Sequence, residues 1–138
     1  MIVTTTTTAS GILYADDDSD DRFFLGESLA AAGINARLIY ARDGEEAIQY
    51  LETTPQQNLL PTLIVLDLNM PRKDGKETLG YLKSNPRFSN IPVIILSTSE
   101  NKSDKDDCAN LGALSYFKKP SRYDEYINII KSFQPYIY

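Results

Sequence analysis

Acidic, hydroxyl and lysine side chains recur in this sequence where short apolar runs end. Carboxylates gathered at one place repel each other and tend to keep their protons unless a cation offsets the crowding. A hard dication such as Mg²⁺ prefers carboxylate and carbonyl oxygens, and a lysine with a hydroxyl can hold phosphoryl oxygens. Such groups suit phosphoryl transfer, in which the protein mainly positions and neutralises charge. The six candidates are Asp16, Asp17, Asp67, Ser97, Thr98 and Lys119.

Two residue types that carry out much of protein catalysis are absent or scarce. The sequence contains no histidine and one cysteine, Cys108. Without histidine, the chain cannot form a Ser-His-Asp triad, a Cys-His pair or a histidine-ligated zinc site, and it cannot act as a histidine phosphodonor. A single cysteine cannot form an internal disulfide. The chemistry must therefore use carboxylates, hydroxyls, lysine or an oxygen-ligated metal.

The composition indicates one acidic domain. A chain of 138 residues with 42% hydrophobic residues is long enough for one compact core and too short for two. Its formal net charge of −5 and its pI of about 4.7 disfavour binding to nucleic acid or an anionic membrane, because phosphate contacts need clustered lysine and arginine. No apolar stretch approaches the length of a signal sequence or a membrane span, so we expect a cytoplasmic protein.

Short apolar runs alternate along the chain with amphipathic segments of helical length, which is typical of βα units around a parallel sheet. Residues 1–10, with their threonine run, are predicted to form a flexible tail, and residues 11–138 to form the domain. Gly33 and Gly112 are expected to end the first and fourth helices. The predicted strands cover 12–15, 36–40, 63–66, 93–96 and 115–118, and the predicted helices cover 20–32, 45–54, 76–84, 102–111 and 123–133.

Four short motifs follow these strands, at the sheet edge where ligands bind in parallel α/β folds. They are Ala15-Asp-Asp-Asp18, then Leu66-Asp-Leu-Asn-Met-Pro71 followed by Asp74-Gly75, then Ile95-Leu-Ser-Thr98 and finally Tyr116-Phe-Lys-Lys-Pro120. Four motifs in this order, each at a strand end, resemble the response-regulator receiver family over about residues 11 to 134.

The resemblance implies a role for each polar residue of the edge. Asp67 is then the phosphoacceptor, and Asp17, Asp67 and the carbonyl oxygen of Asn69 are direct ligands of Mg²⁺. Asp16 supports the metal through water. Lys119 pairs with the phosphoryl group.

The resemblance also implies a conformational switch. Ser97 stands at the position whose hydroxyl moves inward to bond the phosphoryl oxygen, and Tyr116 at the aromatic position that changes rotamer with it. The Lys119-Pro120 bond is expected to be cis, as in the family's proline turn. Thr98 is bulkier than the alanine or glycine often found beside the switch hydroxyl, which would alter access to the acyl phosphate.

The acidic segment after the first strand allows two other interpretations. Asp18, Asp20 and Asp21 are interpreted as a solvated turn that caps the first helix, because aspartate is favoured at helix N-termini. A calcium loop is the sharper competitor, since Asp16, Asp18, Asp20 and Glu27 stand at positions 1, 3, 5 and 12 of an EF-hand. Position 6, however, is Asp21 instead of the required glycine, and a strand replaces the incoming helix.

Other classes share parts of the pattern. The stretch from Asp67 to Asn69 is similar to the aspartate nucleophile of haloacid-dehalogenase phosphatases, but these have a second aspartate where Asn69 stands, and a cap domain. A pseudo-receiver, which signals by protein contact without phosphorylation, remains an alternative. The intact set of acidic residues, with Ser97 and Lys119, argues against it.

These observations predict a doubly wound (βα)₅ domain, a flavodoxin-like α/β receiver with strand order 2-1-3-4-5. We expect a stand-alone response regulator that accepts a phosphoryl group from a sensor histidine kinase or a histidine phosphotransfer protein and then dephosphorylates itself. Its output would be contact with a downstream protein, or a homodimer, through the fourth helix, fifth strand and fifth helix. Lys118, Asn110 and Tyr123 are expected to be exposed there.

Overall fold

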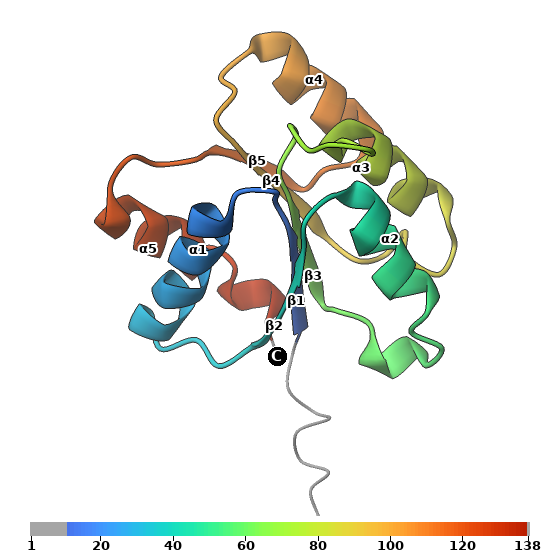
Figure 1. Cartoon of the computed structure of the whole chain (residues 1–138), viewed down its shortest axis with the longest axis horizontal. Helices are drawn as coiled ribbons and strands as arrows, with labels where there is room; N and C mark the ends of the chain where they lie inside the picture. Colours follow the sequence, from blue (N-terminus) through green and yellow to red (C-terminus); the bar gives the residue numbers. More distant parts are fainter. Residues whose placement is uncertain (1–10, 138) are drawn as a thin grey trace, which may run out of the picture.

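The computed structural model describes residues 11–137, so the tail predicted for residues 1–10 lies outside the described residues. Strands alternate with helices along the chain (Figure 1). The strands are β1 (Gly11–Ala15), β2 (Arg37–Ala41), β3 (Leu63–Leu66), β4 (Val93–Ser97) and β5 (Ser115–Lys118). The helices are α1 (Ser19–Ala31), α2 (Gly44–Glu52), α3 (Gly75–Ser84), α4 (Lys102–Leu111) and α5 (Tyr123–Lys131), with two 3-10 helices, η2 (Gln57–Leu59) and η3 (Gln134–Tyr136).

The strands form one parallel sheet in the order β2-β1-β3-β4-β5, which confirms the predicted topology. In register, Ala15 of β1 lies beside Leu66 of β3, and Leu66 lies beside Ile95 of β4. The carboxyl ends of these strands are therefore level with one another. The residues that follow them meet at one edge of the sheet.

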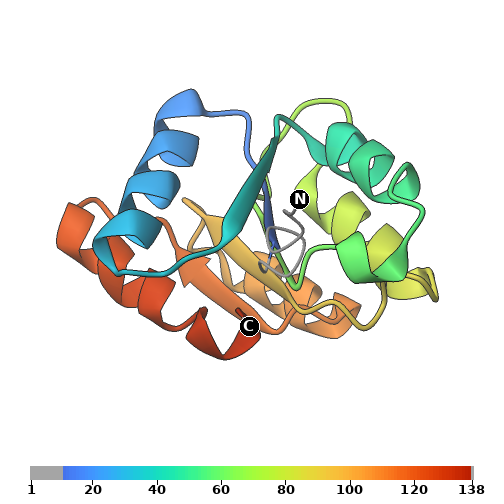
Figure 2. The ribbon, with the colours of Figure 1, turned by 90° about the horizontal axis from the view of Figure 1, so that it is seen from below.

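Helices cover both faces of the sheet. Helices α1 and α5 lie on one face, and α2, α3 and α4 lie on the other, as Figures 1 and 2 both show. A strand that is covered on both faces must be apolar on both. Its sequence is therefore a continuous apolar run and does not alternate between apolar and polar residues. Across residues 11–137, no helix is long and apolar enough to cross a membrane.

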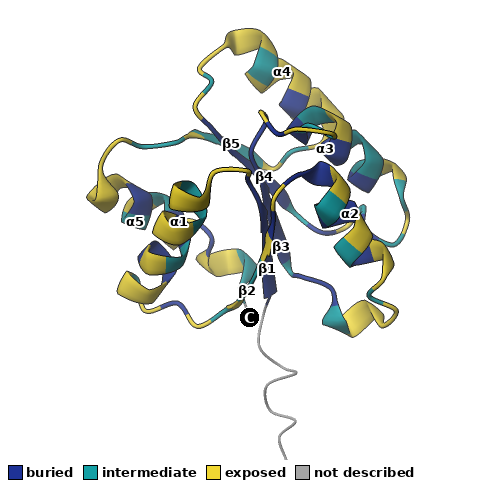
Figure 3. Cartoon of the chain, viewed as in Figure 1, coloured by how far each residue is buried: buried dark blue, intermediate teal, exposed yellow. Residues whose placement is uncertain are grey.

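The core consists of two apolar clusters, one on each face of the sheet. Leu13 and Ile64 point toward α2, α3 and α4, whereas Ile12 and Val65 point toward α1 and α5. The central strands are buried along their whole length (Figure 3). Strands β3 and β4 each bury four aliphatic side chains, which stabilises the sheet strongly, since each side chain contributes about 1.5–3 kcal/mol. This rigid sheet holds the polar residues at its edge.

Aspartate side chains define where three of the helices begin. Asp18 and Asp43 cap α1 and α2 by accepting hydrogen bonds from backbone N–H groups of the first turn. Asp74 caps α3 and forms a reciprocal capping box with Glu77. Such caps satisfy donors that have no partner inside the helix.

The helix ends differ slightly from the sequence prediction. Gly33, with φ +71°, and Gly112, with φ +105°, follow α1 and α4 as predicted, because the left-handed conformation favours glycine. The last helix was predicted to reach residue 133, but α5 ends at Lys131 and the chain continues through η3. Phe133 is nevertheless fully buried. The helical spacing of the apolar residues therefore predicted correctly that Phe133 is buried, but it predicted a helix that is too long.

Candidate functional site

Three carboxylates meet at the carboxyl ends of β1 and β3. Oxygen atoms of Asp16, Asp17 and Asp67 all lie within 4.8 Å of one another. Asp16 is fully buried, Asp67 is 5% exposed, and Asp17 is exposed. The predicted gathering of these residues is therefore confirmed, with Asp17 on the solvent side.

Lys119 supplies the positive charge opposite the carboxylates. It follows β5, where its backbone N–H donates to the Ser97 carbonyl oxygen at 2.7 Å. Its Nζ atom lies 2.8 Å from an Asp16 oxygen and 3.2 Å from an Asp67 oxygen. Only 7% of the Lys119 side chain is exposed, so this lysine is not a solvated surface residue.

Sequence reasoning missed a third carboxylate that contacts the lysine. Asp21 was interpreted as part of a solvated turn, but its Oδ2 atom lies 2.6 Å from Lys119 Nζ. Asp21 stands in the first turn of α1, which points at the site. The sequence did place Asp21 at the start of a helix, directly after the acidic motif. The direction of its side chain, however, depends on how α1 lies against the sheet.

Two tyrosines extend the polar network into the protein. Tyr14 of β1 donates from its hydroxyl to Asp16 Oδ2 at 2.5 Å, and burial together with Asp16 raises the Tyr14 pKa well above its ordinary value. The Tyr126 hydroxyl lies 3.5 Å from Asp21 Oδ1, and burial followed by the Asp21 charge raises the pKa of Tyr126 to about 12. Both tyrosines are therefore neutral hydrogen-bond donors that support the carboxylates.

The electrostatics of the edge favour a cation. Burial and the charge of Asp16 raise the pKa of Asp67 to about 6, although Lys119 opposes this shift. Burial would lower the pKa of Lys119, but its bonds to Asp16 and Asp21 outweigh burial and raise it. One lysine thus only partly offsets the carboxylates around it.

The donor set fits a hard divalent metal. All the candidate ligands are oxygen atoms, and carboxylates from two strand ends converge without a histidine or thiolate among them. Mg²⁺ and Mn²⁺ accept such ligands, whereas zinc prefers nitrogen and sulfur. Asn69, the fourth predicted ligand residue, is exposed in the loop after β3, two residues after Asp67.

The loop after β3 is fixed by close backbone contacts. The Gly75 N–H donates to the Leu68 carbonyl oxygen at 3.0 Å. A Cβ atom on Gly75 would lie 2.3 Å from the carbonyl oxygen of Asp67, far inside van der Waals contact. Arg72, which has φ +62°, forms an ion pair with the buried Asp43 at the start of α2. Glycine at position 75 therefore lets α3 begin directly against the residue that carries the candidate acceptor carboxylate.

Replacing Gly75 by alanine is expected to lower the free energy of unfolding by about 2 kcal/mol, because the new methyl group must displace the Asp67 backbone. Gly80→Ala in the same helix is the matched control. Its Cβ would meet only Leu111 at 3.8 Å, so alanine should stabilise α3 by about 0.5–1 kcal/mol. Urea unfolding of both variants measures the difference, and equal stabilities would contradict the close contact at Gly75.

The predicted switch residues, Ser97 and Tyr116, both contact the loop after β4. Ser97 is the last residue of β4 and is fully buried, and its Oγ atom accepts a hydrogen bond from the Ser99 N–H at 3.2 Å. The half-buried Tyr116 donates from its hydroxyl to the Ser99 carbonyl oxygen at 2.9 Å. Thr98, between them, is exposed. The loop after β4 thus connects the position of Ser97 to that of Tyr116.

One expectation from the sequence is wrong. The Lys119–Pro120 bond is not cis, since no cis peptide bond occurs within residues 11–137. That expectation came from the resemblance alone, and an X–Pro bond prefers trans by about 0.5–1 kcal/mol unless its surroundings demand otherwise. The structure also argues against the calcium-loop alternative, because Asp18 caps α1 and Asp20 already lies within that helix.

The fold and the site first define a class. An open parallel sheet in the order β2-β1-β3-β4-β5, with its polar residues at the carboxyl edge, is a flavodoxin-like α/β architecture. The family model of the response regulator receiver domain matches residues 12–131. The chain therefore belongs to the response regulator receiver family, whose members act in two-component signalling.

Solved structures of response regulators are similar to the chain over most of its length. The phosphorylated cyanobacterial phytochrome response regulator RcpA is 32% identical, with a TM-score of 0.82 and 92% of each chain covered. The Mn²⁺-bound form of response regulator Rcp1 is 33% identical, with a TM-score of 0.79 and 91% of each chain covered. Response regulator RPA3017, in red light signalling of R. palustris, is 31% identical, with a TM-score of 0.81 and 90% of each chain covered. A comparison with curated protein sequences gave no match.

Proposed function

We propose that this protein is a response regulator that accepts a phosphoryl group on Asp67 and returns it to water. The observation that carries this proposal is the position of Asp67, whose nearly buried carboxylate lies between two other carboxylates and Lys119. The donor would be a sensor histidine kinase or a histidine phosphotransfer protein.

The residues of the edge divide the chemistry between them. An Asp67 oxygen attacks phosphorus, forming an O–P bond as the bond between phosphorus and the donor nitrogen breaks. Lys119, anchored by Asp16, holds a phosphoryl oxygen and offsets its charge. Attack by water on phosphorus later releases inorganic phosphate and restores the Asp67 carboxylate.

A divalent ion would complete the charge balance of this reaction. Asp17, Asp67 and the Asn69 carbonyl oxygen would hold Mg²⁺ directly, with Asp16 in support, and the bound ion would neutralise charge on the transferring group. The Mn²⁺-bound form of Rcp1 supports a divalent ion in this family.

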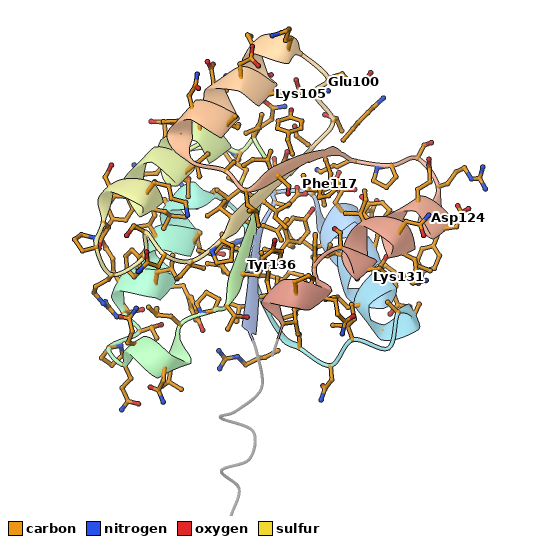
Figure 4. The ribbon with its side chains drawn as sticks, turned by 180° about the vertical axis from the view of Figure 1, so that it is seen from behind. Glu100, Lys105, Phe117, Asp124, Lys131 and Tyr136 are labelled. Carbon is orange, nitrogen blue, oxygen red and sulfur yellow. The ribbon has the colours of Figure 1, made fainter. Side chains whose placement is uncertain are left out.

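The output would be a protein contact near β5. Ser97 and Tyr116 would respond to the phosphoryl group, and the loop after β4 joins them. Figure 4 shows this side of the molecule, with Lys105 on α4 and Asp124 and Lys131 on α5 around β5. The surface residues expected there are indeed exposed, namely Asn110, Lys118 and Tyr123.

Several finer points stay predictions. A homodimer through the same surface and a cytoplasmic location follow from the sequence reasoning alone. Among the similar structures, RcpA is named as a phytochrome response regulator and RPA3017 as a protein of red light signalling. A kinase controlled by light is therefore the first donor to try.

The test is the intact mass of the protein after incubation with acetyl phosphate and Mg²⁺. The wild-type chain should gain one phosphoryl group only when Mg²⁺ is present, and Asp67→Asn should gain none. Asp124→Asn is the matched control, because it also removes one aspartate but lies in an exposed ion pair with Arg122 on α5. It should be phosphorylated like the wild type.

The opposite result would favour the pseudo-receiver. A folded protein that binds Mg²⁺ but gains no phosphoryl group, and that does not respond to beryllofluoride, would make Asp67 a structural residue. Phosphorylation of Asp67→Asn at the wild-type level would place the acceptor elsewhere.

A further inference from the structure

The ammonium group of Lys119 already contacts three carboxylates. A lysine ammonium group has three N–H donors. Its Nζ atom lies within 3.2 Å of three different carboxylates, at 2.6 Å from Asp21, 2.8 Å from Asp16 and 3.2 Å from Asp67. A phosphoryl oxygen that binds Lys119 must therefore compete with these carboxylates for its three N–H donors.

Asp21 is the contact that can be exchanged. Asp16 is fully buried and also accepts from Tyr14, and Asp67 is itself the candidate acceptor. The Asp21 side chain is 21% exposed and belongs to α1, so it can turn away without moving the sheet. Its nearest alternative partner is already in place, since Tyr126 lies 3.5 Å from its second oxygen.

The space beside Asp21 allows this movement. Asp21 lines a pocket of about 310 Å³ between α1 and the segment from Pro120 into α5. Phe24 and Tyr126 form part of its wall. A carboxylate that leaves Lys119 therefore enters a space open to water and avoids burial without a partner.

We propose that Asp21 is a positioning residue that competes with the phosphoryl group for Lys119 and so weakens the affinity of the site for that group. The inference rests on the proposed function. The new element is a carboxylate on α1, that of Asp21, which holds Lys119 in the unphosphorylated protein. Phosphorylation would then release Asp21 from Lys119 and change the contacts where α1 meets α5.

The chain offers a closely matched control for the removal of Asp21. Asp20 is the preceding residue, lies in the same helical turn, carries the same charge and is exposed. Asp20→Asn therefore reproduces the loss of one negative charge near the site but leaves the contacts of Lys119 unchanged. The difference between the two variants isolates the contact of Asp21 with Lys119.

The experiment is a titration with beryllofluoride at saturating Mg²⁺, followed by tyrosine fluorescence. Asp21→Asn is expected to bind beryllofluoride about tenfold more tightly than the wild type, because a charge-assisted bond no longer holds Lys119. Asp20→Asn should stay within about twofold, and Asp21→Glu should restore weaker binding. The affinity for Mg²⁺ alone, measured in parallel, should not increase in Asp21→Asn. A variant that disturbed the structure of the site would bind both Mg²⁺ and beryllofluoride more weakly. Tighter binding of beryllofluoride without tighter binding of Mg²⁺ therefore indicates that Asp21 positions Lys119.

The outcomes separate the inference from the proposed function. If the wild type and all variants fail to bind beryllofluoride, the proposed function is wrong. If the wild type binds, but Asp21→Asn binds no more tightly than Asp20→Asn, the competition for Lys119 is overturned while the proposed function stands. Weaker binding by Asp21→Asn would likewise overturn it and would make Asp21 a helper of Lys119.

Discussion

Lys119→Met is expected to lower the free energy of unfolding by about 3–4 kcal/mol at pH 7 in the absence of divalent metal. The substitution keeps a long apolar stem but removes the cation, which leaves Asp16, Asp21 and Asp67 crowded without compensation. Removing one partner of a buried ion pair usually destabilises a protein by about 3–5 kcal/mol. Urea unfolding at pH 7 measures the effect.

Lys118→Met is the control for this substitution. Lys118 is 54% exposed and pairs with Glu100, which is 67% exposed, so its loss should change stability by less than about 1 kcal/mol. Saturating Mg²⁺ should recover much of the stability lost in Lys119→Met, because the ion supplies positive charge to the same carboxylates. Equal stabilities of the two variants would show that Lys119 does not compensate the buried charges.

Asp67→Asn is expected to change the free energy of unfolding in the opposite direction to Lys119→Met. It should make the metal-free protein more stable by about 3 kcal/mol at pH 7. Burial and Asp16 raise the pKa of Asp67 from 3.8 to about 6 in the folded protein, so the folded state binds the proton more tightly than the unfolded state. The contribution of Asp67 to the stability of the wild type therefore falls as the pH rises from about 4 to about 6, by about 3 kcal/mol in all. Asparagine cannot ionise, so the variant lacks this loss.

The pH dependence distinguishes this effect from a general gain in packing. The stability difference between Asp67→Asn and the wild type should vanish below pH 4 and reach its full size above pH 6. Asp106→Asn removes an exposed carboxylate that pairs with Lys102, and it should follow the wild type within about 0.5 kcal/mol. A difference that stays constant from pH 4 to pH 7 would mean that ionisation of Asp67 is not the cause.

The sheet could be predicted from the sequence because its strands are buried on both faces. The predicted strand 63–66 and helix 102–111 match β3 and α4 at both ends. The predicted strand 36–40 lies one residue before β2, where edge exposure makes the apolar run less distinct. Placing Asp16, Asp67 and Lys119 at strand ends was then sufficient to bring them together.

The contacts made by helices could not be predicted in the same way. Whether Asp21 points at Lys119 or at solvent depends on the rotation and tilt of α1, and these depend on how α1 packs against α5. Tyr126 was missed for the same reason, since its role depends on that packing. The conformation of the Lys119–Pro120 bond likewise depends on its three-dimensional surroundings and not on the two residues alone.

The long sequence separation within the Lys119 cluster has a consequence for how the chain folds. Lys119 follows Asp21 by 98 residues and Asp67 by 52, so all its carboxylate partners leave the ribosome before it does. Until β5 docks on β4, the carboxylates at the edge of the nascent sheet lack the positive charge of Lys119. Closing such a distant contact is slow, because the loop entropy must be lost before the contact forms. Docking of the last strand therefore completes the sheet and neutralises the edge in one event, which couples the C-terminal third of the chain to the stability of the N-terminal part.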